Sequence, residues 1–314
     1  MSGQRRLRIS FCCAETQAEP WLVQLRRALP HADVTLWHSG APLADYAVVW
    51  APPQQFFDEQ TALRAVFNTG AGVDALLRLR MAEQTRIIRL DDAGMAVQMA
   101  EYVCHALLRH VREMGAYAQA QASGQWLQRE PLVRQDYPVG ILGLGVLGQR
   151  VAQAVAHFGF PVHGWTRMPR PELQGGIPTF AGEAGLDAFL AATRVLVCLL
   201  PLTESTRDLL DLRRLGQLRA GAYVINVARG ALIVDEALLA HLDSGQLAGA
   251  TLDVFRTEPL PAGHAFWKHP KITVTPHISA RTLLSESVQQ IAAKLMALEA
   301  GQAVPGTVDR QRGY

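Results

Sequence analysis

The sequence is poor in cysteine, which argues against a fold held together by disulfide bonds. Only four cysteines occur among 314 residues. Cys12 and Cys13 are adjacent, and Cys104 and Cys198 lie within apolar patterns typical of a helix and a strand. Such spacing does not form a disulfide framework. We therefore expect four free thiols and a reducing compartment.

Charge and long apolar runs are also scarce. Charged residues make up 18% of the chain and the formal net charge is +2, with arginines spread along the sequence. A nucleic-acid or membrane-surface partner would call for clustered basic residues. No apolar run has the length needed to span a bilayer. The first residues run directly into a strand-like segment at Leu7–Phe11 without the apolar core of a signal peptide, so we expect a cytoplasmic protein.

Motifs for metal binding and for serine nucleophiles are absent as well. The chain has no His-Glu-x-x-His, no Cys-x-x-Cys and no cluster of histidines at ligand spacing, so no metal is implied. It also has no Gly-x-Ser-x-Gly, which leaves an esterase without a nucleophile.

What the sequence does have is an alternation of strand-like and helix-like segments in both halves. This rhythm predicts parallel sheets covered by helices. We expect strands at 7–12, 34–37, 46–50, 63–67 and 87–90 in the first half and at 139–142, 162–166, 195–200, 223–227, 249–252 and 272–275 in the second. The helical pattern at 283–299 follows the last strand and is expected to return to the first domain. We therefore predict a discontinuous domain of residues 1–100 plus 284–314 and a second domain of residues 101–283.

One long helical segment and two irregular segments stand apart from this alternation. Residues 95–114 predict one long crossover helix, and residues 115–136 are polar and irregular. That segment is too long for a plain connector, and it is either an arm that docks on a partner subunit or a surface excursion. The tail at 304–314 has no periodicity, and its pattern assigns it no role.

A glycine-rich turn organises the second half. An apolar run ends in Gly143-x-Gly145-x-x-Gly148, and a helical pattern follows. In a dinucleotide-binding turn, the first glycine permits the tight bend, the second lets a pyrophosphate approach, and the third lets helix and strand pack closely. The start of the helix offers N–H groups and a positive dipole end to the phosphates. The alternative is a structural turn between a strand and a helix.

The end of the next strand indicates which nicotinamide cofactor is preferred. NAD-selecting sites carry an acidic residue there for the ribose 2′-hydroxyl. This chain has Thr166, Arg167 and Arg170 instead, with no carboxylate in the stretch. Arginines can pair with a 2′-phosphate, which a carboxylate would repel. We predict NADPH over NADH; the alternative is that both arginines are solvated surface residues, which suits Arg170 better than Arg167.

Three polar residues follow predicted strands of the second half, where an open parallel sheet binds its ligands. Arg229 offers a planar cation for a carboxylate and a developing oxyanion, although alone it could equally form a structural ion pair. His277 is a candidate proton donor, and Glu258 a carboxylate that would orient it. His269, like the histidines at 105, 157 and 241, is assigned a structural or surface role.

Together these motifs resemble the D-isomer-specific 2-hydroxyacid dehydrogenases over essentially the whole chain. The resemblance is carried by the glycine turn, by Asn226-Val227-Ala228-Arg229-Gly230, by Asp253-Val254-Phe255 with Glu258-Pro259-Leu260-Pro261, and by Thr275-Pro276-His277. Within that family the chain looks most similar to the glyoxylate/hydroxypyruvate reductase A branch, through the segments 68–74, 140–143 and 308–314. Unlike some phosphoglycerate dehydrogenases of the family, it is expected to lack an extra C-terminal regulatory domain. It has Glu258 where the formate dehydrogenases carry an amide.

The resemblance implies two flavodoxin/Rossmann-like domains with parallel sheets, a cleft between them and a homodimer. The discontinuous domain would bind substrate and the second domain the dinucleotide. Arg229 would bind the substrate carboxylate and carbonyl, and His277 with Glu258 would donate the proton. Backbone N–H groups of Ala71 and Gly72 would hold the other side of the carboxylate. Beyond the glycines and the 166–170 stretch, the expected cofactor contacts are Val146, Leu147, Leu200, Pro201, Thr206, Val227, Ala228 and Asp253, the last near the nicotinamide amide.

The expected function is NADPH-dependent reduction of small 2-keto acids, glyoxylate to glycolate and hydroxypyruvate to D-glycerate. The alternative is a dinucleotide-sensing binding module without physiological turnover, because the family also contains corepressors of that kind. Trp50, Met99 and Tyr102 either line the substrate pocket or merely pack, so the ranking of keto acids stays open.

Overall fold

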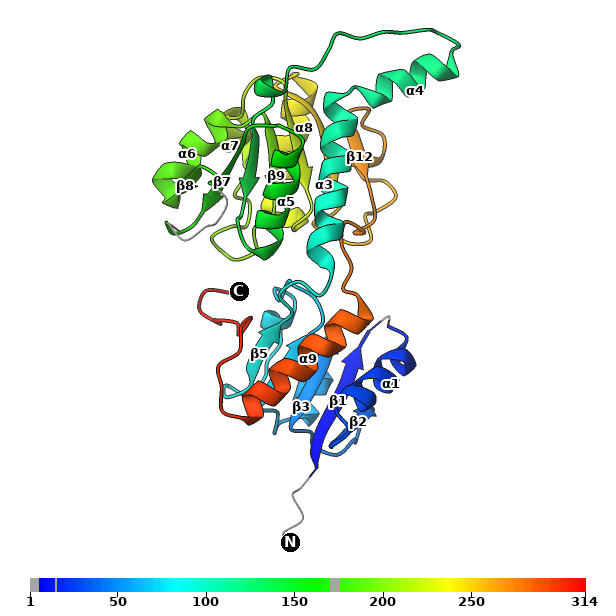
Figure 1. Cartoon of the computed structure of the whole chain (residues 1–314), viewed down its shortest axis with the longest axis vertical. Helices are drawn as coiled ribbons and strands as arrows, with labels where there is room; N and C mark the ends of the chain where they lie inside the picture. The colour runs from blue at the N-terminus through cyan, green and yellow to red at the C-terminus, as the bar shows by residue number, and fades with distance from the viewer. Residues whose placement is uncertain (1–5, 15, 170–175) are drawn as a thin grey trace. The chain divides into compact units, whose positions relative to one another are not determined.

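The computed structural model describes residues 6–14, 16–169 and 176–314. They fold into two compact units (Figure 1), one from Met1–Gly94 and Arg281–Tyr314 and the other from Met95–Ala280. The first unit is therefore built from both ends of the chain. The second unit begins six residues before, and ends three residues before, the boundaries predicted from the sequence (95 against 101, and 280 against 283).

Within its described residues, the first unit contains a five-stranded parallel sheet in the order β2-β1-β3-β4-β5. Its strands are β1 (Leu7–Cys13), β2 (Ala32–Leu36), β3 (Tyr46–Trp50), β4 (Ala65–Asn68) and β5 (Arg86–Arg89). Successive residues of β3 face opposite sides, and both sides are buried: Tyr46 and Val48 lie in one apolar cluster, and Ala47 and Val49 in another. This is why the strand reads as a continuous apolar run.

Helices cover both faces of this sheet. α1 (Ala18–Ala28) and α9 (Leu284–Glu299) pack together over one face (Figure 1), although most of the chain separates them in sequence. α2 (Gln54–Glu59) and the short 3-10 helix η1 (Leu76–Arg78) cover the other face.

The C-terminal tail has a structural role that its sequence does not reveal. It runs antiparallel to β5, where the N–H of Val308 donates to the carbonyl of Ile87 (2.8 Å) and the N–H of Arg89 donates to the carbonyl of Gly306 (2.9 Å). Arg310 also donates to the carbonyl of Thr85 (2.6 Å). The tail therefore covers the edge strand of the sheet, which would otherwise expose unpaired backbone groups.

In its described part, the second unit contains seven parallel strands in the order β12-β11-β10-β9-β6-β7-β8. They are β6 (Val139–Leu142), β7 (Val162–Thr166), β8 (Thr179–Ala181), β9 (Val195–Cys198), β10 (Ala222–Asn226), β11 (Leu247–Leu252) and β12 (Ile272–Val274). The strand order reverses direction between β6 and β9. In sheets of this kind a ligand binds beyond the carboxyl ends of the strands at that reversal.

The faces of this second sheet are also covered by helices. α3 (Met95–Val111) and α5 (Val146–His157) lie over one face, and α6 (Gly182–Ala192), α7 (Leu212–Gly216) and α8 (Asp235–Asp243) over the other. Three 3-10 turns complete the described elements: η2 (Arg134–Asp136), η3 (Gly230–Leu232) and η4 (Ala265–Trp267). None of the helices in the described ranges combines the length and apolarity needed to cross a bilayer.

Several local expectations differ from the structure. The helix predicted over 95–114 ends at Val111, because Glu113 adopts a left-handed conformation (φ 51°), and a separate helix α4 (Met114–Ala122) follows within the segment expected to be irregular. Ala120 is the one buried residue of α4, so its sequence carries no apolar stripe. The short strand β8 and the helix α2 were not predicted.

Candidate active site

The glycine-rich turn joins β6 to α5 with the geometry that a dinucleotide phosphate requires. Gly143 has φ 112°, which only glycine adopts readily. A Cβ atom at position 148 would lie 1.9 Å from the carbonyl oxygen of Gly143, so the helix can approach the strand only with glycine there. A Cβ atom at Gly145 would meet no atom within 4 Å, so this N-cap position of α5 is open. These residues fit a pyrophosphate at the start of α5.

Val146 and Leu147 form the first turn of that helix. Val146 is exposed, whereas Leu147 packs partly against the core between α3 and α5. Gln149 makes the first backbone bond of the helix, to the carbonyl of Gly145 (2.9 Å). N–H groups that precede this bond in a helix have no partner within it. The turn therefore offers the donors that a helix start provides, and its contact with the cofactor stays a prediction.

The end of β7 carries the residues predicted to select NADPH. Thr166 is buried, and its hydroxyl donates to the carbonyl of Met168 (2.7 Å), which shapes the turn. Arg167 is exposed, and its Nη2 lies 3.4 Å from the hydroxyl of Ser205, in the loop after β9. The guanidinium of Arg167 and the hydroxyl of Ser205 thus lie close together at the end of β7. Arg170 lies outside the described residues.

The loop after β9 holds three further predicted cofactor residues. Leu200 belongs to the core beneath the sheet. The hydroxyl of Thr206 donates to the carbonyl of Pro201 (2.7 Å) and accepts from the N–H of Thr203 (2.8 Å). Thr206 is buried, so its side chain fixes the conformation of the loop.

Arg229 follows β10 in a turn that Asn226 holds from both sides. The Asn226 amide donates to the carbonyl of Arg229 (3.0 Å), and its oxygen accepts from the N–H of Ala228 (3.2 Å). The guanidinium donates through Nη1 to the carbonyl of Ala228 (2.7 Å). Val227 and Ala228, both predicted cofactor contacts, are buried in this turn.

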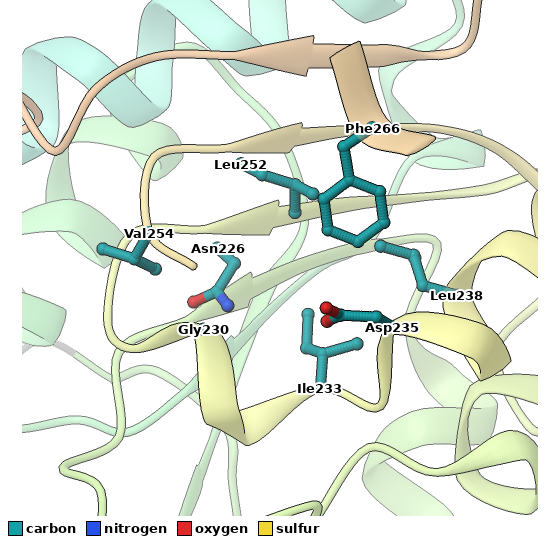
Figure 2. Close-up of a pocket in the computed structure, with 8 residues that line it drawn as sticks. All are labelled: Asn226, Gly230, Ile233, Asp235, Leu238, Leu252, Val254 and Phe266. Carbon is teal, nitrogen blue, oxygen red and sulfur yellow. The ribbon is translucent and has the colours of Figure 1, made fainter. Parts of the chain in front are cut away.

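The interior side of the Arg229 turn is closely packed. A Cβ atom at Gly230 would lie 2.0 Å from the carbonyl carbon of Phe255, so the two loops touch through their backbones. Figure 2 shows the side chains of Asn226, Asp235 and Phe266 around a cavity of about 10 Å³ behind the turn. A cavity of that size holds one water molecule at most. A keto acid therefore does not fit in this cavity.

His277 and Glu258 form a hydrogen-bonded ion pair. Nδ1 of His277 lies 2.7 Å from Oε2 of Glu258, and Oε1 of Glu258 accepts from the N–H of Phe255 (2.9 Å). The accessible fractions of the two side chains are 43% for His277 and 36% for Glu258, so a small molecule can reach them. Burial alone would raise the pKa of the Glu258 carboxyl, but the bonds from His277 and Phe255 and the charges of His277 and Arg229 hold it below its usual value.

Asp253 is fully buried and accepts hydrogen bonds from the turn that carries His277. Its Oδ1 accepts from the N–H of Ile278 (2.9 Å) and the hydroxyl of Thr275 (2.6 Å), and its Oδ2 accepts from the N–H of Ser279 (2.7 Å). The predicted contact with the nicotinamide amide stays a prediction. What the structure shows is a carboxylate fully engaged with the His277 turn.

Ala71 and Gly72 belong to the first unit, in the turn after β4. Asn68 donates to the carbonyls of Gly70 and Gly72 (2.9 Å each), which occupies the carbonyl groups of the turn. Among the described residues, the N–H groups of Ala71 and Gly72 find no acceptor. The turn therefore offers two donors, and their contact with a substrate carboxylate stays a prediction.

Arg229, Glu258 and His277 all lie in the second unit, as do the glycine turn and Arg167. Sequence reasoning missed Ser205 beside Arg167 and the Thr275 hydroxyl that bonds to Asp253. The position of Thr275 directly after a strand and two residues before His277 was a usable signal. Nothing in the sequence links Tyr102, 173 residues away, to Thr275. In the parts of the chain that the structure describes, no group of three or more metal-ligating side chains comes together.

A family model described as the NAD binding domain of D-isomer specific 2-hydroxyacid dehydrogenases matches residues 104–279, more than half of the chain. The glyoxylate/hydroxypyruvate reductase A of Yersinia enterocolitica is 43% identical over 305 residues, covering 95% of this chain and 97% of that protein.

Two solved structures share the fold over nearly the whole chain. A D-isomer specific 2-hydroxyacid dehydrogenase from Xanthobacter autotrophicus, in complex with NADPH and MES, has a TM-score of 0.92 and 38% identity, with 99% of this chain and 100% of that chain covered. An NADPH-dependent glyoxylate/hydroxypyruvate reductase from Sinorhizobium meliloti, in complex with NADP and sulfate, has a TM-score of 0.91 and 34% identity, with 98% and 100% covered.

Proposed function

The chain belongs to the family of D-isomer specific 2-hydroxyacid dehydrogenases, and we propose that it reduces glyoxylate to glycolate and hydroxypyruvate to D-glycerate with NADPH. The observation that carries this proposal is the ion pair of His277 and Glu258, 2.7 Å long, with the charge of Arg229 acting on the same carboxylate. A proton donor and an anion-binding cation in one place are what keto-acid reduction demands.

Each of these side chains has a distinct task. Nδ1 of His277 is bonded to Glu258, so Nε2 is the nitrogen left to give its proton to the carbonyl oxygen. Glu258 favours the protonated ring and fixes its orientation. Arg229 binds the carboxylate and stabilises the charge that develops on the carbonyl oxygen. NADPH, when bound, supplies the hydride.

Arg167 is proposed to select NADPH over NADH by pairing with the 2′-phosphate. Its exposed guanidinium beside the Ser205 hydroxyl supports this role, since charge-assisted bonds to phosphate oxygens are strong. Arg170 is proposed as a second phosphate ligand on the sequence alone. The N–H groups of Ala71 and Gly72 are proposed to bind the substrate carboxylate.

We also propose a cytoplasmic homodimer in which the segment 115–136 docks on the partner subunit. Trp126 in this segment is 94% exposed, and Leu127 and Val133 are exposed as well. Large apolar side chains gathered on one exposed segment are typical of a contact surface.

The test compares His277→Gln with His241→Gln, a matched change at a half-buried histidine on α8 that the mechanism does not use. The oxidation of NADPH is followed by its absorbance on adding glyoxylate or hydroxypyruvate. We expect turnover by the parent protein, a loss of kcat of roughly 10²–10⁴-fold in His277→Gln, and little change in His241→Gln. A parent protein that binds NADPH without turnover would instead be a dinucleotide sensor. A fully active His277→Gln would remove His277 from the mechanism.

A further inference from the structure

A chain of three polar side chains leads from α3 to the turn that carries His277. The hydroxyl of Tyr102 on α3 lies 2.5 Å from the hydroxyl of Thr275, directly after β12. The Thr275 hydroxyl donates in turn to Oδ1 of Asp253, after β11, over 2.6 Å. All three residues lie in the second unit, and the chain joins a helix to two strand ends.

The hydrogens along this chain can run in one direction only. A hydroxyl has one hydrogen, and that of Thr275 goes to the Asp253 carboxylate. Tyr102 must therefore donate to the Thr275 oxygen. Burial, partly offset by the hydrogen bond to Thr275, raises the pKa of Tyr102 to about 12, so the phenol keeps the hydrogen that it donates.

Asp253 in turn holds the backbone around His277. Its carboxylate accepts from the N–H groups of Ile278 and Ser279, and its carbonyl accepts from the N–H of His277 (2.8 Å). His277 itself has φ 53°, a left-handed conformation that a histidine adopts only when its surroundings impose it. The hydrogen bonds that Asp253 accepts from this turn hold His277 in the left-handed conformation.

We propose that Tyr102 is a positioning residue for His277, acting through the Thr275 hydroxyl and the Asp253 carboxylate. Without the Tyr102 hydroxyl, the orientation of the Thr275 hydroxyl toward Asp253 is less restricted. The turn that orients the imidazole of His277 then becomes more mobile. The inference rests on the proposed role of His277 as proton donor. The expected loss is in turnover, because a misaimed donor lowers the rate of the chemical step.

The kinetic test uses Tyr102→Phe, Thr275→Val and the double variant. The matched control is Tyr223→Phe, because Tyr223 makes the same kind of buried tyrosine–threonine bond, to Thr251 (2.7 Å), and Thr251 does not bond to Asp253. For Tyr102→Phe we expect kcat to fall about three- to tenfold with KM for NADPH unchanged, as for loss of one hydrogen bond. The double variant should be no slower than Thr275→Val, since both changes break one chain. Thr275→Ser keeps the hydroxyl and should retain activity.

A second readout needs neither cofactor nor turnover. Histidine ring NMR of the cofactor-free protein, with the His277 signal identified by its loss in His277→Gln, should show this signal shifted or broadened in Tyr102→Phe and unchanged in Tyr223→Phe. Any of three results overturns the inference while leaving the proposed function intact: normal kcat in Tyr102→Phe, equal losses in Tyr102→Phe and Tyr223→Phe, or an undisturbed His277 signal. An inactive parent protein instead refutes the proposed function, and the NMR comparison still decides whether Tyr102 positions His277.

Discussion

At the scale of the residue, the chemistry depends on how one half-exposed imidazole is held. His277 has a left-handed backbone conformation (φ 53°), which costs on the order of 1–3 kcal/mol for a residue other than glycine. The hydrogen bonds that Asp253 accepts from the turn offset this cost. Glu258 then fixes the ring through Nδ1. The position of the ring therefore depends on two carboxylates from one loop.

The pH dependence of the Glu258–His277 pair follows from the lowered pKa of Glu258. A carboxyl whose pKa is lower in the folded than in the unfolded chain stabilises the fold above the unfolded value, and this stabilisation is lost as pH falls through the folded value. The pair is therefore intact at neutral pH and is broken by Glu258 protonation only in acid.

Replacing Glu258 by Gln should lower the reduction rate and remove the loss of rate on the acid side. The parent enzyme loses the bond to His277 when the Glu258 carboxyl is protonated, whereas the amide of the variant does not titrate. We expect kcat/KM near neutral pH to fall about tenfold or more, measured across a pH series. Glu236→Gln, a change on α8 outside the site, is the control. An unchanged rate and acid limb in Glu258→Gln would contradict the pairing.

The residue types of the site could be predicted from the sequence, but their partners could not. Arg229, Glu258 and His277 each follow a recognisable strand, so local pattern located them. The bonds of Tyr102 with Thr275 and of Arg167 with Ser205 join segments that only the folded sheet brings together.

At the scale of the element, the turn between β6 and α5 shows how little space separates helix and strand. The carbonyl of Gly143 occupies the position that a Cβ at Gly148 would need, whereas Gly145 faces open space. Packing therefore requires the glycine at 148, whereas the glycine at 145 leaves open space at the start of the helix.

Gly145→Ala should fold normally and bind NADPH at least about tenfold more weakly. No atom within 4 Å opposes the added methyl group, but the methyl group stands where the pyrophosphate approaches the backbone. Thermal unfolding and NADPH titration by fluorescence measure the two properties. Gly263→Ala, which also meets no atom within 4 Å, should change neither. Gly148→Ala should instead destabilise the protein itself. Unaltered NADPH affinity in Gly145→Ala would place the pyrophosphate elsewhere.

Deleting residues 304–314 should destabilise the first unit by a few kcal/mol, roughly the sum of two backbone hydrogen bonds and two buried valines. The deletion also uncovers the edge of β5, so we expect faster aggregation. Melting temperature and light scattering report the two effects. Deleting only residues 311–314 keeps the bonds of Gly306 and Val308 and should have a small effect. Equal stability of the two truncated chains would show that the tail does not hold the edge.

Elements with an apolar stripe or run could be predicted, and those without one could not. Residues 139–142 and 284–299 bury a regular set of side chains and were located within a residue or two. α4 buries only Ala120, and β8 is a three-residue edge strand, so neither imposes a pattern on the sequence.

At the scale of the whole molecule, each unit has its own sheet and its own apolar cores. The discontinuous arrangement could be predicted because the helical pattern at 283–299 follows the last strand of the second half. The predicted domain boundaries differ from the observed ones by a few residues. The first unit ends directly before α3, and the helical pattern of the sequence gives no sign of a boundary at that point.

The preference of the whole protein for NADPH over NADH should depend on one side chain, that of Arg167. Arg167→Ala should raise KM for NADPH by about 10–100-fold, the range expected for a charge-assisted bond, and leave KM for NADH nearly unchanged. Arg213→Ala, which removes an exposed arginine paired with Asp187 on the far side of the sheet, is the control. Steady-state kinetics with both cofactors decide the point, and a parallel loss with NADH would mean that Arg167 does not read the 2′-phosphate.

The most direct test of the account is to follow the hydride itself. The protein is incubated with glyoxylate and NADPH that carries deuterium at the transferable position, and the glycolate is analysed by mass spectrometry. The account predicts glycolate with one deuterium on the hydroxyl-bearing carbon, formed in a one-to-one ratio with the NADPH consumed, and almost none with His277→Gln. Bound NADPH without labelled glycolate, or equal labelling with His277→Gln, would contradict it.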